Sequence, residues 1–157
     1  PDADVSIGYL PYTKRNIIEQ MFRLYGTPYG WHGREGMRDC SGTIRVVMRC
    51  FGIVTGKSTS IILNSADRQV RIDPNLSREE KMKIVSQIEP VVTVAGNSGH
   101  IVMLLGKGKN GMLYFIHEAG WDYTDGDQVY MVRRTTINAA DHKFYSIDAP
   151  NVFTTMK

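Results

Sequence analysis

One cysteine in the sequence lies where a thiol could act as a nucleophile. Cys40 stands in the run Arg38-Asp39-Cys40-Ser41-Gly42, and the residues after it have helical hydrophobic spacing. At the first turn of a helix, free backbone N–H groups and the helix dipole favour an anion, so we expect a lowered thiol pKa. The same N–H groups can stabilise the oxyanion that forms when a thiol attacks a carbonyl. From this segment alone, a nucleophile and a structural cysteine are equally good interpretations.

A thiol nucleophile needs a base, and two of the four histidines flank a predicted hairpin. The turn is assigned to residues 106–111, so Leu105 pairs with Met112 in simple register. The same register places His100 directly opposite His117. Facing residues on neighbouring strands have Cβ atoms ~5 Å apart. We therefore predict that His100 is the general base and that His117 orients its ring.

Other interpretations of these residues stay open. The two histidines could be core residues whose ring nitrogens are satisfied. Cys40, His100 and His117 could also bind zinc, although the thiol lacks the short ligand spacing of most Cys/His zinc motifs. Residues 106–111 match a dinucleotide-binding glycine pattern, but a strand rather than a helix follows, which indicates a hairpin turn. His32 lies in a glycine-rich loop and is predicted to be exposed.

The elements that must position these residues come in two blocks. Hydrophobic spacing and capping residues predict helices over residues 14–25, 40–51 and 78–88, the last with a capping box. A glycine-rich aromatic loop spans residues 26–38. Strands are predicted at residues 91–95, 100–105, 112–118, 129–133 and 144–147, whereas residues 53–76 show no clear pattern. Helices followed by strands indicate an α+β domain with an antiparallel sheet.

Composition limits the classes of function. The chain has 157 residues, 42% of them hydrophobic and 22% charged, which suits one domain with a sizeable core. The net charge of +3 comes from scattered residues, so nucleic-acid binding, which needs a clustered basic patch, is not expected. No apolar stretch approaches the ~20 residues of a membrane helix. Cys40 and Cys50 would lie about 15 Å apart on one helix, too far for a disulfide, and Cys50 is predicted to be a core residue.

The residues around this site resemble the NlpC family of papain-like cysteine peptidases. The resemblance covers roughly residues 8–121 and rests on the segments PYGWHG (28–33), RDCSG (38–42), GHIVMLLG (99–106) and IH (116–117). Members of the family cleave peptidoglycan stem peptides after γ-linked D-glutamate, usually before a diamino acid such as diaminopimelate. The resemblance implies a papain-like fold that needs no cofactor, with Cys40 as nucleophile, His100 as base and His117 as the residue that orients it.

The resemblance also implies where substrate binds. Tyr29, Asp39 and Ser41 match family positions that line the substrate site. Trp31 is a further candidate and is expected to pack under its loop. In one branch of the family, the aspartate before the cysteine holds the ammonium group of a free N-terminal L-alanine. The chain departs from the family pattern at His32, where glycine is common, and at residues 62–66 and 91–98, so the departures fall on substrate subsites.

These observations predict a γ-D-glutamyl-diamino acid endopeptidase that acts on murein peptides in the cell envelope. Residues 1–157 are expected to form a single catalytic domain, with residues 1–12 as a linker. Residues 7–13 resemble the joint that follows bacterial Src-homology-3-like domains, which implies such domains upstream. The alternatives are another thiol acyl-transfer enzyme on the same fold, such as a murein amidase or transacylase, and a non-catalytic murein-binding domain. The intact set of Cys40, His100 and His117 argues against the last of these.

Overall fold

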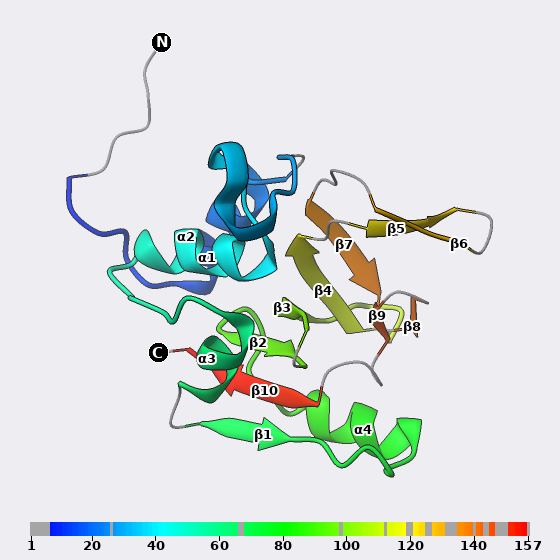
Figure 1. Ribbon diagram of the computed structural model, residues 1–157. Helices are drawn as coiled ribbons and strands as arrows, with labels where there is room; N and C mark the ends of the chain where they lie inside the picture. The colour runs from blue at the N-terminus through cyan, green and yellow to red at the C-terminus, as the bar shows by residue number, and fades with distance from the viewer. Residues whose placement is uncertain are drawn as a thin grey trace.

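One antiparallel sheet organises the chain (Figure 1). The computed structural model describes residues 7–25, 27–65, 68–97, 99–111, 113–118 and 151–156, together with the backbone of the strands between residues 121 and 146. Within these residues the sheet has six strands, in the order β1 (Gln69–Arg71), β10 (Val152–Thr155), β2 (Thr93–Gly96), β3 (Ile101–Lys107), β4 (Leu113–Glu118) and β7 (Thr135–Ala139). Two separate strand pairs are β5 (Trp121–Thr124) with β6 (Asp127–Tyr130), and β8 (Asp141–His142) with β9 (Tyr145–Ser146).

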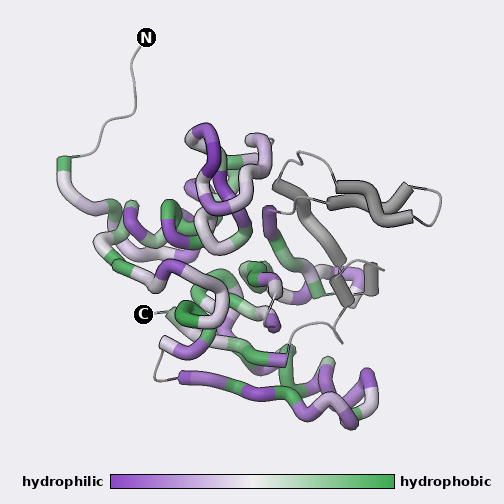
Figure 2. Tube along the Cα trace, in the orientation of Figure 1, coloured by the Kyte–Doolittle hydropathy of each residue, from purple (hydrophilic) through white to green (hydrophobic). Residues whose placement is uncertain are grey.

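Helices lie on both faces of this sheet (Figure 1), and its antiparallel pairing throughout confirms the α+β prediction. One face carries α1 (Lys14–Arg23), α2 (Cys40–Arg49) and α3 (Thr59–Asn64), and the other carries α4 (Arg78–Val85). Neighbouring strand residues point to opposite faces, so Met103 packs in the cluster under α2 and Leu104 in the cluster under α4. The central strands are correspondingly apolar (Figure 2). No helix among the described residues is long and apolar enough to cross a membrane.

The predicted capping residues begin the helices. The Thr13 hydroxyl accepts a hydrogen bond from the Asn16 N–H, and Ser77 and Glu80 form the predicted capping box at α4. The three predicted helices are confirmed, although each ends two or three residues earlier than expected. The residues after these ends form turns instead. Most of their N–H groups donate to the carbonyl three residues earlier, as is common in the last turn of a helix.

Several elements escaped the sequence prediction. Residues 53–76 contain α3 and β1, and the chain end forms β10. Strand β10 lies between β1 and β2, where Phe153 pairs with Ala95 on one side and with Val70 on the other. The run VFTT (152–155) favours a strand and follows Pro150 and Asn151, residue types that are typical of turns, but four residues are too few to predict which strands they pair with. Strands β6 and β9 overlap the predictions at residues 129–133 and 144–147, whose other residues lie outside the described part of the chain.

Candidate active site

Cys40 is the first residue of α2, as predicted, and Asp39 is its N-cap. One carboxylate oxygen of Asp39 accepts hydrogen bonds from the Gly42 N–H at 2.7 Å and from the Ser41 hydroxyl at 2.9 Å. The Cys40 side chain is 8% exposed. Its Sγ lies 3.9 Å from the Thr59 hydroxyl, and the backbone of Ser41 and of Ile101 lies near enough to the thiol to lower its pKa. Because Ile101 directly follows His100, these contacts bring the nucleophile helix against the histidine strand.

The two predicted histidines meet in the interior. The Nε2 atom of His100 lies 2.9 Å from Nδ1 of His117, and both side chains are buried. The rings meet edge to face, with centroids 5.0 Å apart. They therefore lie on one face of the sheet, as the orienting role requires. Since Nε2 of His100 contacts His117, Nδ1 is the atom of His100 that would exchange a proton with a thiol.

The predicted register of these two strands is wrong by two residues. Met103 pairs with Ile116 and Leu104 with Phe115, and an irregularity follows at Leu105. Continued by one residue, this register places Val102, not His100, opposite His117. A shift of two residues preserves the face on which a side chain lies. The histidines are therefore diagonal neighbours, which aromatic rings can bridge.

Burial reverses the expected shift of the Cys40 pKa. Removal from water raises the pKa of the thiol, and the nearby Asp39 carboxylate adds to the rise. The hydrogen bonds from Ile101, Thr59 and Ser41 act in the opposite direction without overcoming it. Burial also lowers the pKa of His100 to about 4. Near neutral pH the resting pair is thus a neutral thiol and a neutral imidazole, rather than a thiolate–imidazolium pair.

This protonation state has a measurable consequence for alkylation. Iodoacetamide reacts with thiolates, so the alkylation rate of Cys40 should keep rising as the pH increases through and beyond the ordinary thiol pKa of 9.0. The rate can be followed by mass spectrometry in a Cys50→Ala background, which leaves Cys40 as the single cysteine. A rate that is already at its plateau between pH 5 and 7 would contradict the neutral pair.

The loop before α2 places Tyr29 close to the thiol. A parallel bridge joins Tyr29 to Arg38, and the Gly30 N–H donates to the Arg38 carbonyl at 2.8 Å. Only glycine fits here, because a Cβ on Gly30 would lie 2.4 Å from the Met37 Cβ. Burial raises the pKa of Tyr29, and the charges of Cys40 and Asp39 contribute to the rise. Tyr29, Asp39 and Cys40 therefore share one environment.

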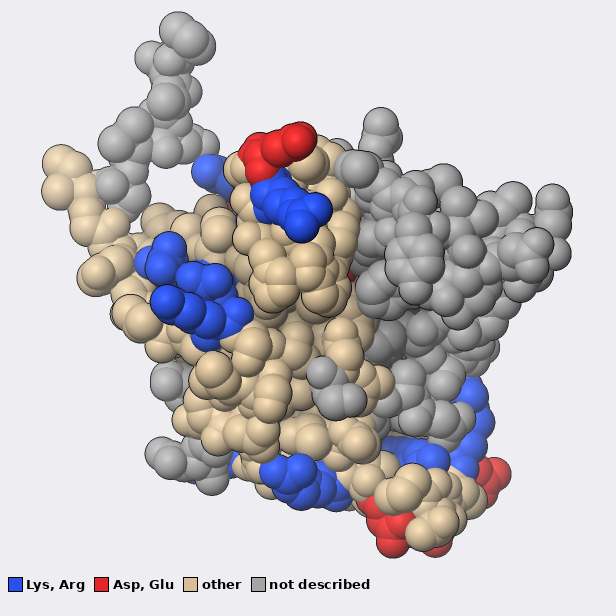
Figure 3. Space-filling view, viewed as in Figure 1, with Lys and Arg blue, Asp and Glu red and all other residues tan. Residues whose placement is uncertain are grey.

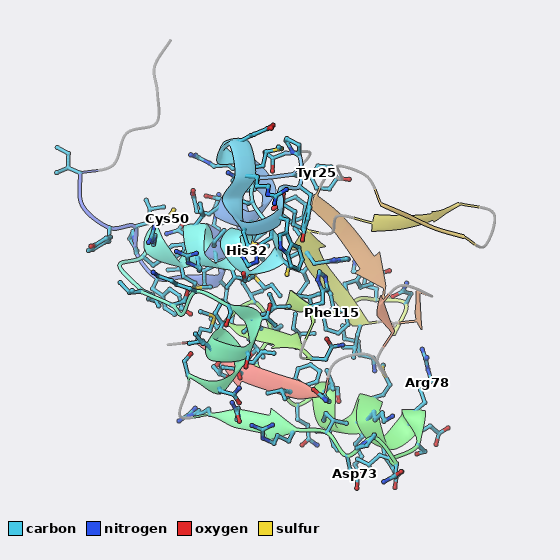
Figure 4. The ribbon with its side chains drawn as sticks, viewed as in Figure 1. Tyr25, His32, Cys50, Asp73, Arg78 and Phe115 are labelled. Carbon is cyan, nitrogen blue, oxygen red and sulfur yellow. The ribbon has the colours of Figure 1, made fainter. Side chains whose placement is uncertain are left out.

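Trp31 does not pack under this loop as expected. Its side chain is 56% exposed and touches His32 edge to face, with ring centroids 5.0 Å apart. His32 and Gly33 both have positive φ angles, which turn the chain outward after Gly30. The His32 N–H donates to the second carboxylate oxygen of Asp39 at 3.2 Å, so this turn is tied to the start of α2 (Figure 4). His32 is exposed, as predicted.

Glu118 is a site residue that the sequence analysis missed. Its side chain is completely buried at the end of β4, where one carboxyl oxygen accepts a hydrogen bond from the Thr43 hydroxyl of α2. Among the described residues, the other oxygen has no hydrogen-bond partner. Burial raises the Glu118 pKa to about 7, and the charge of Glu118 in turn adds to the raised pKa of Tyr29. The available signal was an acid directly after His117 in an otherwise apolar strand.

The raised pKa of Glu118 predicts a change of stability with pH. Folding raises this pKa from 4.5 to about 7, so the folded chain holds the proton more tightly, and this stabilisation is lost as the pH rises through 7. Glu118→Gln stays neutral at every pH. The free energy of unfolding of Glu118→Gln minus that of the parent should therefore be about 1–3 kcal/mol larger at pH 8 than at pH 5.

Urea unfolding of both proteins at the two pH values measures this difference. His100 titrates in parent and variant alike and cancels. Glu79→Gln, at an exposed position on α4, is the matched control. The prediction fails when the difference in stability between Glu118→Gln and the parent is the same at pH 5 and at pH 8.

The fold is shared with solved peptidoglycan hydrolases. An NlpC/P60 endopeptidase from Photobacterium damselae subsp. piscicida superposes with a TM-score of 0.69 at 20% identity, over 91% of this chain and 39% of that one. The NlpC/p60 domain of the peptidoglycan hydrolase SagA gives 0.58 at 20% identity, over 92% and 99% of the two chains. The chain has the NlpC/P60 fold. Its resemblance to that family at the sequence level is thus matched by its three-dimensional structure.

Another neighbour with this NlpC/P60 fold is the peptidoglycan hydrolase RipB from Mycobacterium tuberculosis, with a TM-score of 0.57 at 16% identity, over 97% of this chain and 74% of that one. No protein-family model and no curated protein sequence matches the chain. Within the described residues, no three His, Cys, Asp or Glu side chains form a group that could hold a metal ion.

Proposed function

We propose that the chain is a cysteine endopeptidase that hydrolyses γ-D-glutamyl-diamino acid bonds in peptidoglycan stem peptides. The observation that carries the proposal is the buried contact between His100 and His117, together with the backbone of Ile101, directly after His100, lying near the Cys40 thiol at the start of α2. The NlpC/P60 fold and the residue-level resemblance support the choice of murein peptides as substrate. The function needs no cofactor.

The reaction follows from the neutral resting pair. As Cys40 Sγ attacks the γ-carbonyl carbon, its proton passes to Nδ1 of His100, while His117 holds the ring in place. Backbone N–H groups at the start of α2 stabilise the oxyanion. The intermediate collapses to a thioester when the C–N bond breaks, and the leaving amine takes the proton from His100. Water then adds to the thioester with His100 as base, which releases the glutamyl carboxylate and restores the thiol.

The acidic surroundings of Cys40 fit a cationic substrate group. Asp39 and Tyr29 are proposed to bind the ammonium group of an N-terminal L-alanine, and Ser41 helps to hold the Asp39 carboxylate. That carboxylate already accepts three hydrogen bonds. An ionised carboxylate has about four lone-pair sites, so one site remains for an ammonium N–H. Trp31 forms the exposed rim of the same loop.

Product analysis tests this function most directly. The tripeptide L-Ala-γ-D-Glu-diaminopimelate should give L-Ala-D-Glu and free diaminopimelate, identified by mass spectrometry. Release of an intact stem peptide from muramic acid, with the tripeptide left uncut, would favour the amidase alternative. Transfer of the glutamyl group to an added amine would favour a transacylase. Binding to murein without any turnover would leave only the non-catalytic alternative.

We also propose a domain organisation and a cellular location for the protein. The chain spans 39% of the length of the Photobacterium endopeptidase. We infer that residues 1–157 are one catalytic domain, which residues 1–12 join to upstream Src-homology-3-like domains. The proposed substrate places the protein in the cell envelope, periplasmic or secreted.

A further inference from the structure

A basic cleft of about 300 Å³ lies on the outer face of the nucleophile helix. Arg45 and Arg49 of α2 line it together with Lys57 from the segment that follows. Asp39 and Gly42, at the start of the helix, line its other end. In the space-filling view, blue side chains gather over α2 and the segment after it, with no red atoms beside them (Figure 3).

Helical geometry separates this cleft from the reacting thiol. Successive residues of an α-helix are rotated by about 100°, so Gly42, Arg45 and Arg49 form one stripe along the helix. Cys40 lies on the nearly opposite side, where it packs against the sheet. A ligand in the cleft would therefore not contact the bond being cut. The cleft and the catalytic centre adjoin at the first turn of α2, where Asp39 lines the cleft and directly precedes Cys40.

Three of the four cations that line the cleft have no acidic partner within the described part of the chain. Neither Arg45, Arg49 nor Lys57 makes an ion pair there, whereas the charge of Arg38 acts on Glu118. Asp39 is the acidic residue of the lining, and its carboxylate is engaged by the Gly42 and His32 N–H groups and the Ser41 hydroxyl. Arg45 and Arg49 are also four residues apart, and like charges at this spacing destabilise a helix by about 0.2–0.5 kcal/mol. An anionic ligand would remove this repulsion.

We propose that this cleft is an exosite that binds carboxylates of the murein polymer at a distance from the peptide being cut. The inference rests on the proposed function, because that substrate supplies the anions. A γ-linked glutamate keeps its α-carboxylate free, and a neighbouring stem peptide with diaminopimelate adds more. Guanidinium groups match carboxylates through paired N–H···O bonds. The exosite gives the enzyme a preference for stem peptides that are still cross-linked to the murein polymer over released peptides.

The test reverses the charges of the cleft without touching the catalytic residues. Arg45→Glu/Arg49→Glu is compared with Arg78→Glu/Lys83→Glu, which makes the same change of net charge on α4, at the other end of the molecule (Figure 4). Both are combined with Cys40→Ala and sedimented with murein sacculi stripped of phosphodiester polymers. The cleft variant should bind about tenfold more weakly than the Cys40→Ala parent, and the α4 variant should bind like that parent.

A second measurement uses the same two double variants with Cys40 intact. The polymeric substrate is sacculi pretreated with a murein amidase, which frees the L-alanine ends of stem peptides that cross-links still hold to the polymer. Turnover of these sacculi should fall about tenfold for the cleft variant, whereas its kcat/KM on the soluble tripeptide should stay within about twofold. Equal binding by the cleft variant, an equal loss in the α4 variant, binding that requires the phosphodiester polymers, or an equal fall on the tripeptide would each overturn the exosite. The binding arm needs no turnover, so it can succeed or fail independently of the proposed peptidase activity.

Discussion

Cys40→Ala should lower turnover of the L-Ala-γ-D-Glu-diaminopimelate tripeptide by at least about 10⁴-fold. The thiol supplies the bond to the acyl group, and an alanine methyl group has no atom that can replace it. The fold should survive, because the substitution removes one small atom and leaves the Asp39 cap of α2 in place. Product release measured by mass spectrometry, together with the thermal unfolding curve, checks both statements.

Cys50→Ala is the matched control for this substitution. Cys50 is partly buried just after α2, and its thiol contacts the Val46 carbonyl at 3.5 Å rather than any group of the active site. Its removal should leave kcat/KM within about twofold of the parent. An active Cys40→Ala variant would refute the assignment of the nucleophile, and an equally inactive Cys50→Ala variant would show that the loss reflects damage to α2.

His100→Gln should lower kcat by about 10²–10⁴-fold, the usual contribution of a general base. A glutamine amide can keep a hydrogen bond to His117 but cannot accept the proton of the thiol. His117→Asn should act differently, because an amide still offers a hydrogen-bond partner to Nε2 of His100. We expect about a tenfold fall, which corresponds to one weakened hydrogen bond of about 1.4 kcal/mol.

Steady-state kinetics on the tripeptide measures both variants, with far-ultraviolet circular dichroism as the check on folding. The order of the two effects is the critical result. A larger loss in His117→Asn than in His100→Gln would exchange the two roles. Near-parental activity in both variants would show that the buried histidine pair is structural.

Local signals in the sequence were sufficient for much of this molecule. The residue types Thr13, Asp39 and Ser77 predicted where three helices begin, because a capping side chain bonds to backbone groups only a few residues away. The α+β class followed from the order of helical and strand patterns. The pairing of His100 with His117 was predicted on the correct face even though the register was wrong, since strand alternation tolerates a shift of two residues.

Only the tertiary structure decided the properties that depend on distant segments. Burial against the sheet raises the Cys40 pKa, although the helix start by itself predicted a lower one. Glu118 belongs to the site because β4 carries it under Thr43 of α2. Basic residues that look scattered along the chain form one cleft once Lys57 folds back beside α2. Sequence patterns report on neighbours along the chain, whereas desolvation and charge act through space between residues that folding brings together.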